Sequence, residues 1–223
     1  NDNQTYGLGV AKAFEESAVK NGIQIVGTSA WDAKQPNYTA LMQSVKASGA
    51  DMVYLGGIYD NNGGQLVKDK VAVLGPNDGA VKLLGPDGFT GYPDLVALDQ
   101  AKGMYLTFAG LTQQQLKEAG GAGAKLLDAY QTKYDKAPDG SYPLYGVAAV
   151  QVILDAIAKS DGTRKSVTEQ VLGGSGITIP ADQSVLGKEI KIDPTTGDTS
   201  AKDLTIEIIK DGKETFEKSQ SIS

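Results

Sequence analysis

Residues 51–60 read Asp51-Met-Val-Tyr-Leu-Gly-Gly-Ile-Tyr-Asp60, and residues 81–92 read Val81-Lys-Leu-Leu-Gly-Pro-Asp-Gly-Phe-Thr-Gly-Tyr92. Each begins as a short run of apolar and β-branched residues that stops at glycine, a pattern typical of a buried strand. A helical segment separates them, so the strands form a βαβ unit and should be parallel. The loops that follow leave the carboxyl edge of the sheet, where open α/β sheets bind ligands. We therefore expect these loops to contact a small-molecule ligand, and the first candidates for that contact are Tyr59, Asp60, Asp87 and Tyr92.

The overall composition excludes several kinds of function. The chain has 223 residues, 40% hydrophobic and 22% charged, as in ordinary globular proteins. Its net charge of −6 argues against a nucleic-acid partner, whose backbone requires a basic face. It has no cysteine and no histidine, which excludes thiol chemistry, disulfides, Cys/His zinc sites and a Ser-His catalytic arrangement. No apolar run approaches the ~20 residues of a membrane span.

Strand starts near residues 23, 51, 81 and 104 recur at the spacing of a βα repeat. This pattern predicts an α/β fold with a doubly wound, mostly parallel sheet. The opening Tyr6-Gly7 motif has the character of a βα loop, so one more strand is expected before Asn1. The predicted strands are 23–29, 52–56, 81–84 and 104–108, and the predicted helices are 6–20, 38–48, 64–74 and 93–98.

The character of the sequence changes after Gly110. Residues 144–159 are apolar on nearly every side, which predicts a buried helix. Two alternating stretches, 188–193 and 204–210, flank Pro194-Thr-Thr-Gly197 and predict a hairpin. A boundary is expected near 107–111, with the chain crossing back near 202–205. Further helices are predicted at 111–135, interrupted at 119–123, and at 166–172.

Each candidate binding residue also has a purely structural explanation. Tyr6 could pack on the sheet edge, Gly56-Gly57 could form a tight turn, and the Pro-Asp-Gly sequence at Asp87 is a β-turn signature. Motifs for other ligands do not fit. Residues 193–203 lack the closing Glu of a calcium loop, and the Gly-Lys pairs at residues 187 and 212 are followed by Glu, unlike a phosphate loop. We expect no metal site and no cofactor.

Three motifs, in this order and spacing, resemble the type I periplasmic binding proteins, and among them the branched-chain amino-acid (Leu/Ile/Val) substrate-binding proteins of ABC transporters. The motifs are Asn1-Asp-Asn-Gln-Thr-Tyr-Gly7, Asp51-Met-Val-Tyr-Leu-Gly-Gly57 and Gly85-Pro-Asp-Gly88. The resemblance implies a ligand held between two α/β lobes by Tyr6, by an aromatic just after the Gly-Gly turn, and by Asp87, which would pair with an α-ammonium group. The chain departs from the family because Ile58 follows Gly57 directly and Tyr59 comes one position later, so both are candidates.

The resemblance also implies how the chain is divided. Residues 1–108 with 204–223 resemble the second ligand-binding lobe, and residues 109–203 resemble the C-terminal part of the first lobe, with its helices and hairpin. Family members carry more of the first lobe before the Tyr-Gly motif, so we expect a C-terminal fragment of a processed, exported protein. Without its own sheet, the region 111–190 should expose apolar faces such as Ile153 and Ile157 and self-associate.

The function implied by the resemblance is solute binding without catalysis. The chain would belong to the extracytoplasmic binding component of an ABC importer, periplasmic or at the cell surface. Its ligand would be a branched-chain amino acid or a similar small zwitterion. Its protein partner would be the permease of the transporter. The alternative is a ligand-sensing domain of a receptor or regulator with the same fold. An enzyme, which we do not expect, would need two acids in one cleft; only Asp87 with Asp60 or Asp32 could supply them.

Overall fold

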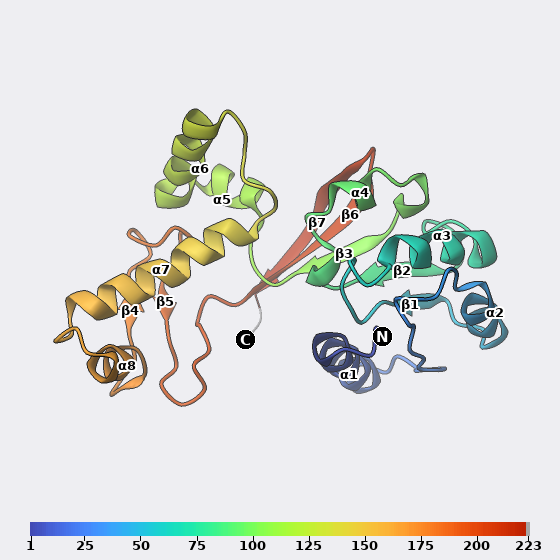
Figure 1. Cartoon of the computed structure of the whole chain (residues 1–223), viewed down its shortest axis with the longest axis horizontal. Helices are drawn as coiled ribbons and strands as arrows, with labels where there is room; N and C mark the ends of the chain where they lie inside the picture. Colours follow the sequence, from blue (N-terminus) through green and yellow to red (C-terminus); the bar gives the residue numbers. More distant parts are fainter. Residues whose placement is uncertain (222–223) are drawn as a thin grey trace. The chain divides into compact units, whose positions relative to one another are not determined.

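The chain folds into two compact units (Figure 1). The computed structural model describes residues 1–221. The first unit comprises residues 1–108 and 205–218, and the second comprises residues 109–204 and 219–221 of the described chain.

The first unit is built on a five-stranded mixed sheet with the strand order β1-β2-β3-β6-β7. Strands β1 (Met52–Tyr54), β2 (Lys82–Gly85) and β3 (Tyr105–Phe108) are parallel, and β6 (Asp203–Lys210) is antiparallel to β3. Strand β7 (Lys213–Ser221) follows β6 after Asp211-Gly212, whose φ angles of 49° and 71° suit a two-residue hairpin turn. The predicted α/β class is confirmed, with three parallel strands at one end of the sheet.

Helices cover the two faces of this sheet unequally. Helices α2 (Thr39–Ala47) and α3 (Gly63–Leu74) supply the buried side chains of Met42, Leu66 and Val67 to the core. On the opposite face α1 (Thr5–Lys20) packs at β1, where the Phe14 ring stacks on Tyr54 with the centroids 4.1 Å apart. The shorter helical segments are η1 (Asp87–Phe89), α4 (Pro93–Val96) and η2 (Asp99–Ala101).

The predicted strand at 23–29 is wrong. These residues are extended but belong to no strand, and all except Ile25 are exposed. The physical reason is that a strand requires a neighbouring strand to complete its hydrogen bonds. Strand β1 is the outermost strand at that end of the sheet.

The second unit consists mainly of helices. They are α5 (Gln113–Ala119), α6 (Gly121–Tyr134), α7 (Tyr142–Ala158) and α8 (Arg164–Leu172). A short ribbon joins β4 (Thr178–Ile179) to β5 (Ile190–Lys191) in antiparallel pairing. The core of this unit is therefore a helix layer on a two-stranded ribbon, and its most buried members include Leu116, Leu144, Ala156, Ile177 and Ile190.

Helix α7 is not buried on every side as predicted. Leu144, Ala148, Val152 and Ala156 form a buried face at four-residue spacing, whereas the opposite face is 46–59% exposed and carries Val150, Ile153, Leu154 and Ile157. The ribbon and the neighbouring helices cover only one side of it. Within residues 1–221, no helix is long and apolar enough to cross a membrane.

The predicted hairpin has a different second arm. The turn after Asp193 forms, since Gly197 N donates to Asp193 O at 2.8 Å, but the bridge that follows pairs Ile192 with Thr199. Residues 204–210 instead lie in β6, where Ile206 is opposite Thr107 of β3. Ile209 of this strand belongs to the core of the first unit, which the local pattern could not indicate.

Candidate functional site

Tyr6 and Asp87 meet at the carboxyl edge of the parallel strands. Tyr6 lies in the first turn of α1, and Asp87 opens η1 directly after β2. The Tyr6 hydroxyl donates a short hydrogen bond to Asp87 Oδ1 and accepts one from Gly88 N at 3.3 Å. Burial and the Asp87 carboxylate raise the pKa of Tyr6 well above its usual value, so this hydroxyl keeps its proton at neutral pH. The pair thus presents a protonated phenol beside a carboxylate.

Ile58 lies on the same side as this pair, next to Gly88. A Cβ added at Gly88 would sit 2.5 Å from Gly57 O, 2.9 Å from Ile58 Cγ2 and 3.1 Å from Tyr6 Cε1. Only glycine fits such a close approach of two loops without a shift. The loops after β1 and β2 are also tied by Tyr59 N, which donates to Gly88 O at 2.9 Å.

The Tyr59 side chain packs away from that cluster. Its ring centroid is 4.7 Å from that of Tyr92 and 6.3 Å from that of Phe89, in a tilted and an edge-on arrangement. The Tyr92 hydroxyl donates to Asp60 Oδ2 at 3.0 Å. Burial raises the pKa of both Tyr59 and Tyr92, with Asp94 and Asp60 adding to the shift at Tyr59 and Asp60 adding to that at Tyr92. The four predicted site residues therefore fall into two neighbouring groups, Tyr6, Ile58 and Asp87 in one and Tyr59 in the other.

Asp2 is an organising residue of the site that the sequence did not indicate. Its carboxylate is buried, 5% exposed, and accepts hydrogen bonds from Asn61 Nδ2 at 2.7 Å, Gln4 N at 3.1 Å and Ile58 N at 3.3 Å. It thereby fastens the start of α1 to the loop after β1. A Cβ at Gly7 would lie 1.9 Å from Asp2 Oδ1, so the glycine of the Tyr-Gly motif leaves room for this carboxylate. The only sequence signal for Asp2 is its place in the opening motif.

Nothing in the described part of the chain gathers three or more His, Cys, Asp or Glu side chains that could hold a metal ion. The chemistry that the cluster can perform is recognition. It offers one negative charge, one aliphatic side chain and aromatic surface, which suits a small cationic or zwitterionic molecule with an apolar part.

Comparison with known proteins places the chain among binding proteins. A family model described as "Periplasmic binding protein" matches residues 1–203. A curated relative, the leucine-, isoleucine-, valine-, threonine- and alanine-binding protein of Pseudomonas aeruginosa, is 29% identical over 161 residues, covering 71% of this chain and 40% of that protein. The chain thus spans less than half the length of this relative.

Solved structures share the fold over nearly the whole chain. A leucine-binding protein from Thermotoga maritima matches with a TM-score of 0.77 at 20% identity. The match covers 98% of this chain and 58% of the Thermotoga chain. An ABC transporter substrate-binding protein from Desulfitobacterium hafniense in complex with Leu has a TM-score of 0.67 at 21% identity, covering 96% of this chain and 57% of its own. Since the family model matches most of its length, the chain belongs to the periplasmic binding protein family.

Proposed function

We propose that this chain is part of the extracytoplasmic solute-binding component of an ABC importer, and that it binds an amino acid, branched-chain or similar, without catalysis. The observation that carries the proposal is the Tyr6–Asp87 pair at the carboxyl edge of the parallel strands, beside Ile58. Family membership and the names of the relatives, several of which are Leu/Ile/Val-binding proteins, support the class of ligand.

In this proposal Asp87 pairs with the α-ammonium group of the ligand, out of water. The Tyr6 hydroxyl, held as a proton donor, fixes the orientation of the carboxylate and adds its ring, 37% exposed, to the wall of the site. Ile58 contacts the apolar side chain of the ligand. Tyr59 supports the site from the neighbouring group, through its ring contacts with Tyr92 and Phe89. A charge-assisted hydrogen bond in such a setting is stronger than one between neutral groups.

The same proposal assigns the two units to two lobes. Residues 1–108 with 204–223 form the second lobe, and residues 109–203 are the C-terminal part of the first. The protein acts in the periplasm or at the cell surface and delivers its ligand to a transporter permease. The compact units of the chain, with their boundary at residue 108, are compatible with this division.

The test compares leucine with 4-methylpentanoate, which is leucine without its amino group. Each is titrated calorimetrically into the full-length protein, as wild type and as Asp87→Asn. Removing one partner of a buried ion pair costs on the order of 3–5 kcal/mol, so leucine affinity should fall by roughly two to three decades. The affinity for 4-methylpentanoate should change little, because that ligand has no ammonium group to lose its partner.

Asp99→Asn is the matched control, since Asp99 is an exposed acid of the first unit that lies in η2, outside the two groups of site residues. It should leave the preference for leucine intact. If Asp87→Asn binds leucine as the wild type does, with an unchanged melting temperature, Asp87 is only a turn residue. Equal losses of affinity in both variants would mean that the overall negative charge, rather than Asp87, attracts the ligand.

A further inference from the structure

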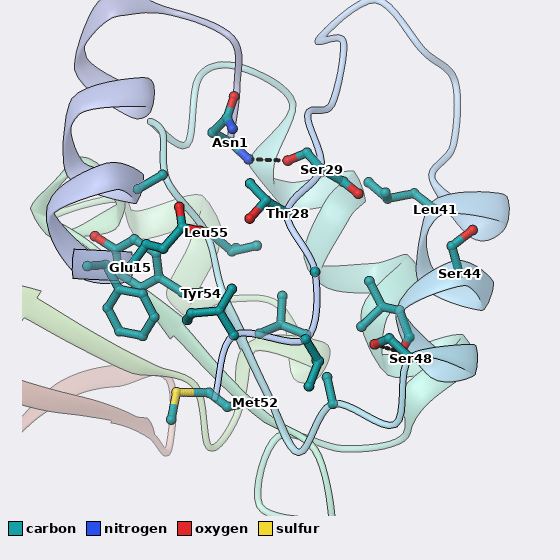
Figure 2. A pocket seen from close by; sticks show the side chains of 18 of the residues that line it. Asn1, Glu15, Thr28, Ser29, Leu41, Ser44, Ser48, Met52, Tyr54 and Leu55 are labelled. Atoms are coloured by element: carbon teal, nitrogen blue, oxygen red, sulfur yellow. Dashed lines mark hydrogen bonds between the residues drawn. The ribbon is translucent and has the colours of Figure 1, made fainter. Parts of the chain in front are cut away.

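Two parts of the first unit carry polar groups that the proposed site does not use. One is a groove of about 550 Å³ along the outer edge of β1, which Figure 2 shows between Glu15 of α1 and Leu41 of α2. The charged side chains described along it, Glu15 and Asp51, are not buried, so they would orient a ligand only weakly. The other part is a pair of acids, the buried Glu207 of β6 and the partly buried Glu214 of β7, which is bonded to a loop of the candidate site.

Glu207 is an acid on the core face of the sheet. Its side chain is 7% exposed, and it lies opposite Leu106 of β3, which is 0% exposed and belongs to the core. Residues directly opposite each other in an antiparallel pair point to the same face, so the carboxyl group of Glu207 is directed toward the apolar core. Burial and the neighbouring Glu214 raise its pKa to about 7.

Glu214 is the charged neighbour that acts on Glu207 within the described chain. The other charged side chains of the adjacent elements are engaged or directed elsewhere. On the hairpin itself, Lys210 and Glu217 are paired with each other at 3.2 Å. Asp94 of α4 and Asp99 of η2 are exposed. The state of the two acids is therefore decided mainly between them.

The Glu214 side chain reaches from β7 to the loop that follows β2. Its Oε1 accepts a hydrogen bond from Gly91 N at 2.7 Å, between residues 123 positions apart. Gly91 has a φ of 78°, a conformation that glycine adopts without strain. This hydrogen bond ties the middle of the loop 87–92 to the sheet.

The loop 87–92 carries members of both groups of candidate site residues. At its start, Thr90 N and Oγ1 donate to Asp87 O at 3.0 and 2.8 Å. Directly after Gly91, the ring centroid of Tyr92 is 4.7 Å from that of Tyr59. A displacement of Gly91 would therefore disturb both the acid of the site and its aromatic neighbour.

We propose that Glu214 is a positioning residue of the binding site, and that the charge of Glu207 decides whether it holds Gly91. The inference rests on the proposed function, because it names a regulation of that same site. When Glu207 is protonated, Glu214 keeps its hydrogen bond and the loop is fixed. When Glu207 loses its proton, two carboxylates lie close together in a poorly solvated place, where like charges repel. Glu214 is on the outermost strand and partly exposed, so it turns toward water and releases Gly91 N.

The sign of the pH dependence follows from the order in which the two acids ionise. The hydrogen bond from Gly91 favours the charged form of Glu214 and lowers its pKa, although burial raises it more. Glu207 has no such donor among the causes of its shift, and its pKa is about 7. Ligand affinity should therefore fall as the pH rises through 7. By linkage, ligand binding should favour the protonated Glu207 and take up protons near this pH.

The test measures leucine binding to the full-length protein by calorimetry at about pH 6 and about pH 8, on either side of the Glu207 pKa. The wild type should bind leucine at least about fivefold more weakly at the higher pH. In two buffers that differ in heat of ionisation, it should show proton uptake on binding near pH 7. Glu207→Gln, which stays neutral, should bind equally well at both pH values and take up no proton. A Glu207→Gln variant with the wild-type pH dependence would overturn the proposal.

Variants of Glu214 separate positioning from general stability. Glu214→Gln keeps an acceptor for Gly91 N without the charge, so it should bind leucine at both pH values as the wild type does at the lower one. Glu214→Leu removes the acceptor and should bind weakly at both. Glu217→Gln, at an exposed acid of the same strand, removes the same charge and should keep the wild-type pH dependence. Wild-type affinity at both pH values in Glu214→Leu would contradict the positioning role.

The Gly91 amide distinguishes a failure of this inference from a failure of the proposed function. In the ligand-free 223-residue chain, its NMR resonance should titrate with a midpoint near pH 7, and this titration should be absent in Glu207→Gln. If the resonance titrates but leucine does not bind at either pH, the control of the loop is upheld and the proposed ligand is wrong. If leucine binds equally at both pH values and the resonance does not titrate, the proposed function stands and this inference is wrong.

Discussion

The two units bury their apolar side chains in different ways. In the first, a sheet lies under α2 and α3, and Val67, Leu83, Phe89 and Leu106 reach 0% exposure. In the second, a two-stranded ribbon of two residues per strand supports the helices, and α7 keeps one apolar face 46–59% exposed. A wide sheet gives each helix a surface that matches its apolar stripe, whereas a short ribbon covers only part of it. We therefore expect the first unit to be stable by itself and to unfold cooperatively. The stability of the second unit should depend on contacts that cover the exposed face of α7.

The largest effect on stability is expected from a substitution of Lys70, whose buried ammonium group holds loops of the first unit together. Its side chain is 0% exposed, and Nζ donates to Val81 O at 2.6 Å, Gly75 O at 3.0 Å and Pro76 O at 3.4 Å. Burial lowers the pKa of Lys70 to about 8. Lys70→Met fills similar space but leaves these carbonyls without their donor, so the free energy of unfolding should fall by about 3 kcal/mol or more.

Urea unfolding followed by Trp31 fluorescence measures this loss. Trp31 is the only tryptophan of the chain and is buried in the first unit, 4% exposed. Lys68→Met, at an exposed position of the same helix, is the control and should change stability by less than about 0.5 kcal/mol. Similar losses in the two variants would show that the buried ammonium group does not hold the first unit together.

Local signals predicted the elements and the edge of the site, but not the long-range contacts. The helix ends at Asn21-Gly22, Gly49 and Gly75-Pro76 are marked by residues that stop helices, and the structure ends its helices within two residues of them. The βαβ pattern correctly brought the loops of Ile58 and Asp87 to one edge of the sheet. The Tyr6–Asp87 bond joins residues 81 positions apart, which no local pattern encodes.

The wrong predictions share one physical cause. Residues 23–29 have the composition of a strand, yet a strand also needs a neighbour to pair with, and the sequence of the segment says nothing about that neighbour. Residues 204–210 pair with β3, about 100 positions earlier in the chain, rather than with the adjacent segment. The buried Asp2 carboxylate accepts hydrogen bonds from Ile58 N and Asn61 Nδ2, more than 50 positions later in the chain, and a short polar stretch gives no sign of such contacts.

A smaller effect is expected from the acids of the first unit, which make its stability depend on pH. Glu207 on β6 is 7% exposed, and burial, with Glu214 nearby, raises its pKa from 4.5 to about 7. The folded state therefore binds more protons than the unfolded state between these pH values. Protonation of Glu207 therefore stabilises the folded state fully below pH 4.5. This contribution is lost as the pH rises through 7, where the buried carboxyl group loses its proton. Burial also raises the pKa of Glu214, whose carboxylate accepts a hydrogen bond from Gly91 N.

Glu207→Gln should remove this dependence. A difference of 2.5 pKa units at 1.36 kcal/mol each corresponds to about 3.4 kcal/mol. Because the carboxylate is not completely shielded from water, the variant should raise the free energy of unfolding at pH 8 by somewhat less, about 2–3 kcal/mol, and change it little at pH 4. Trp31 fluorescence in urea at both pH values gives the measurement. Glu217→Gln, at an exposed acid paired with Lys210, should shift stability by less than about 1 kcal/mol. An identical pH profile in Glu207→Gln and wild type would contradict the assignment.

The smallest expected effect is on self-association of the chain through the second unit. The question is whether the exposed apolar face of α7 drives it. Val150, Ile153, Leu154 and Ile157 recur at helical spacing along one face of α7. A contiguous apolar surface of this kind favours self-association, although the net charge of −6 opposes it. Ile153→Glu with Ile157→Glu should weaken association of the 223-residue chain by about tenfold or more, equivalent to about 1.4 kcal/mol.

Charge alone must be separated from the loss of apolar surface. Gln131→Glu with Thr168→Glu adds the same two negative charges at exposed positions of α6 and α8. Sedimentation equilibrium of the three proteins over a wide concentration range distinguishes the causes. If the α7 face is the contact, only the isoleucine variant shifts strongly toward monomer, because the control leaves the apolar face intact. A wild-type chain that stays monomeric throughout would mean that a helix with one open apolar face is tolerated in this fold, and that the second unit is as self-sufficient as the first.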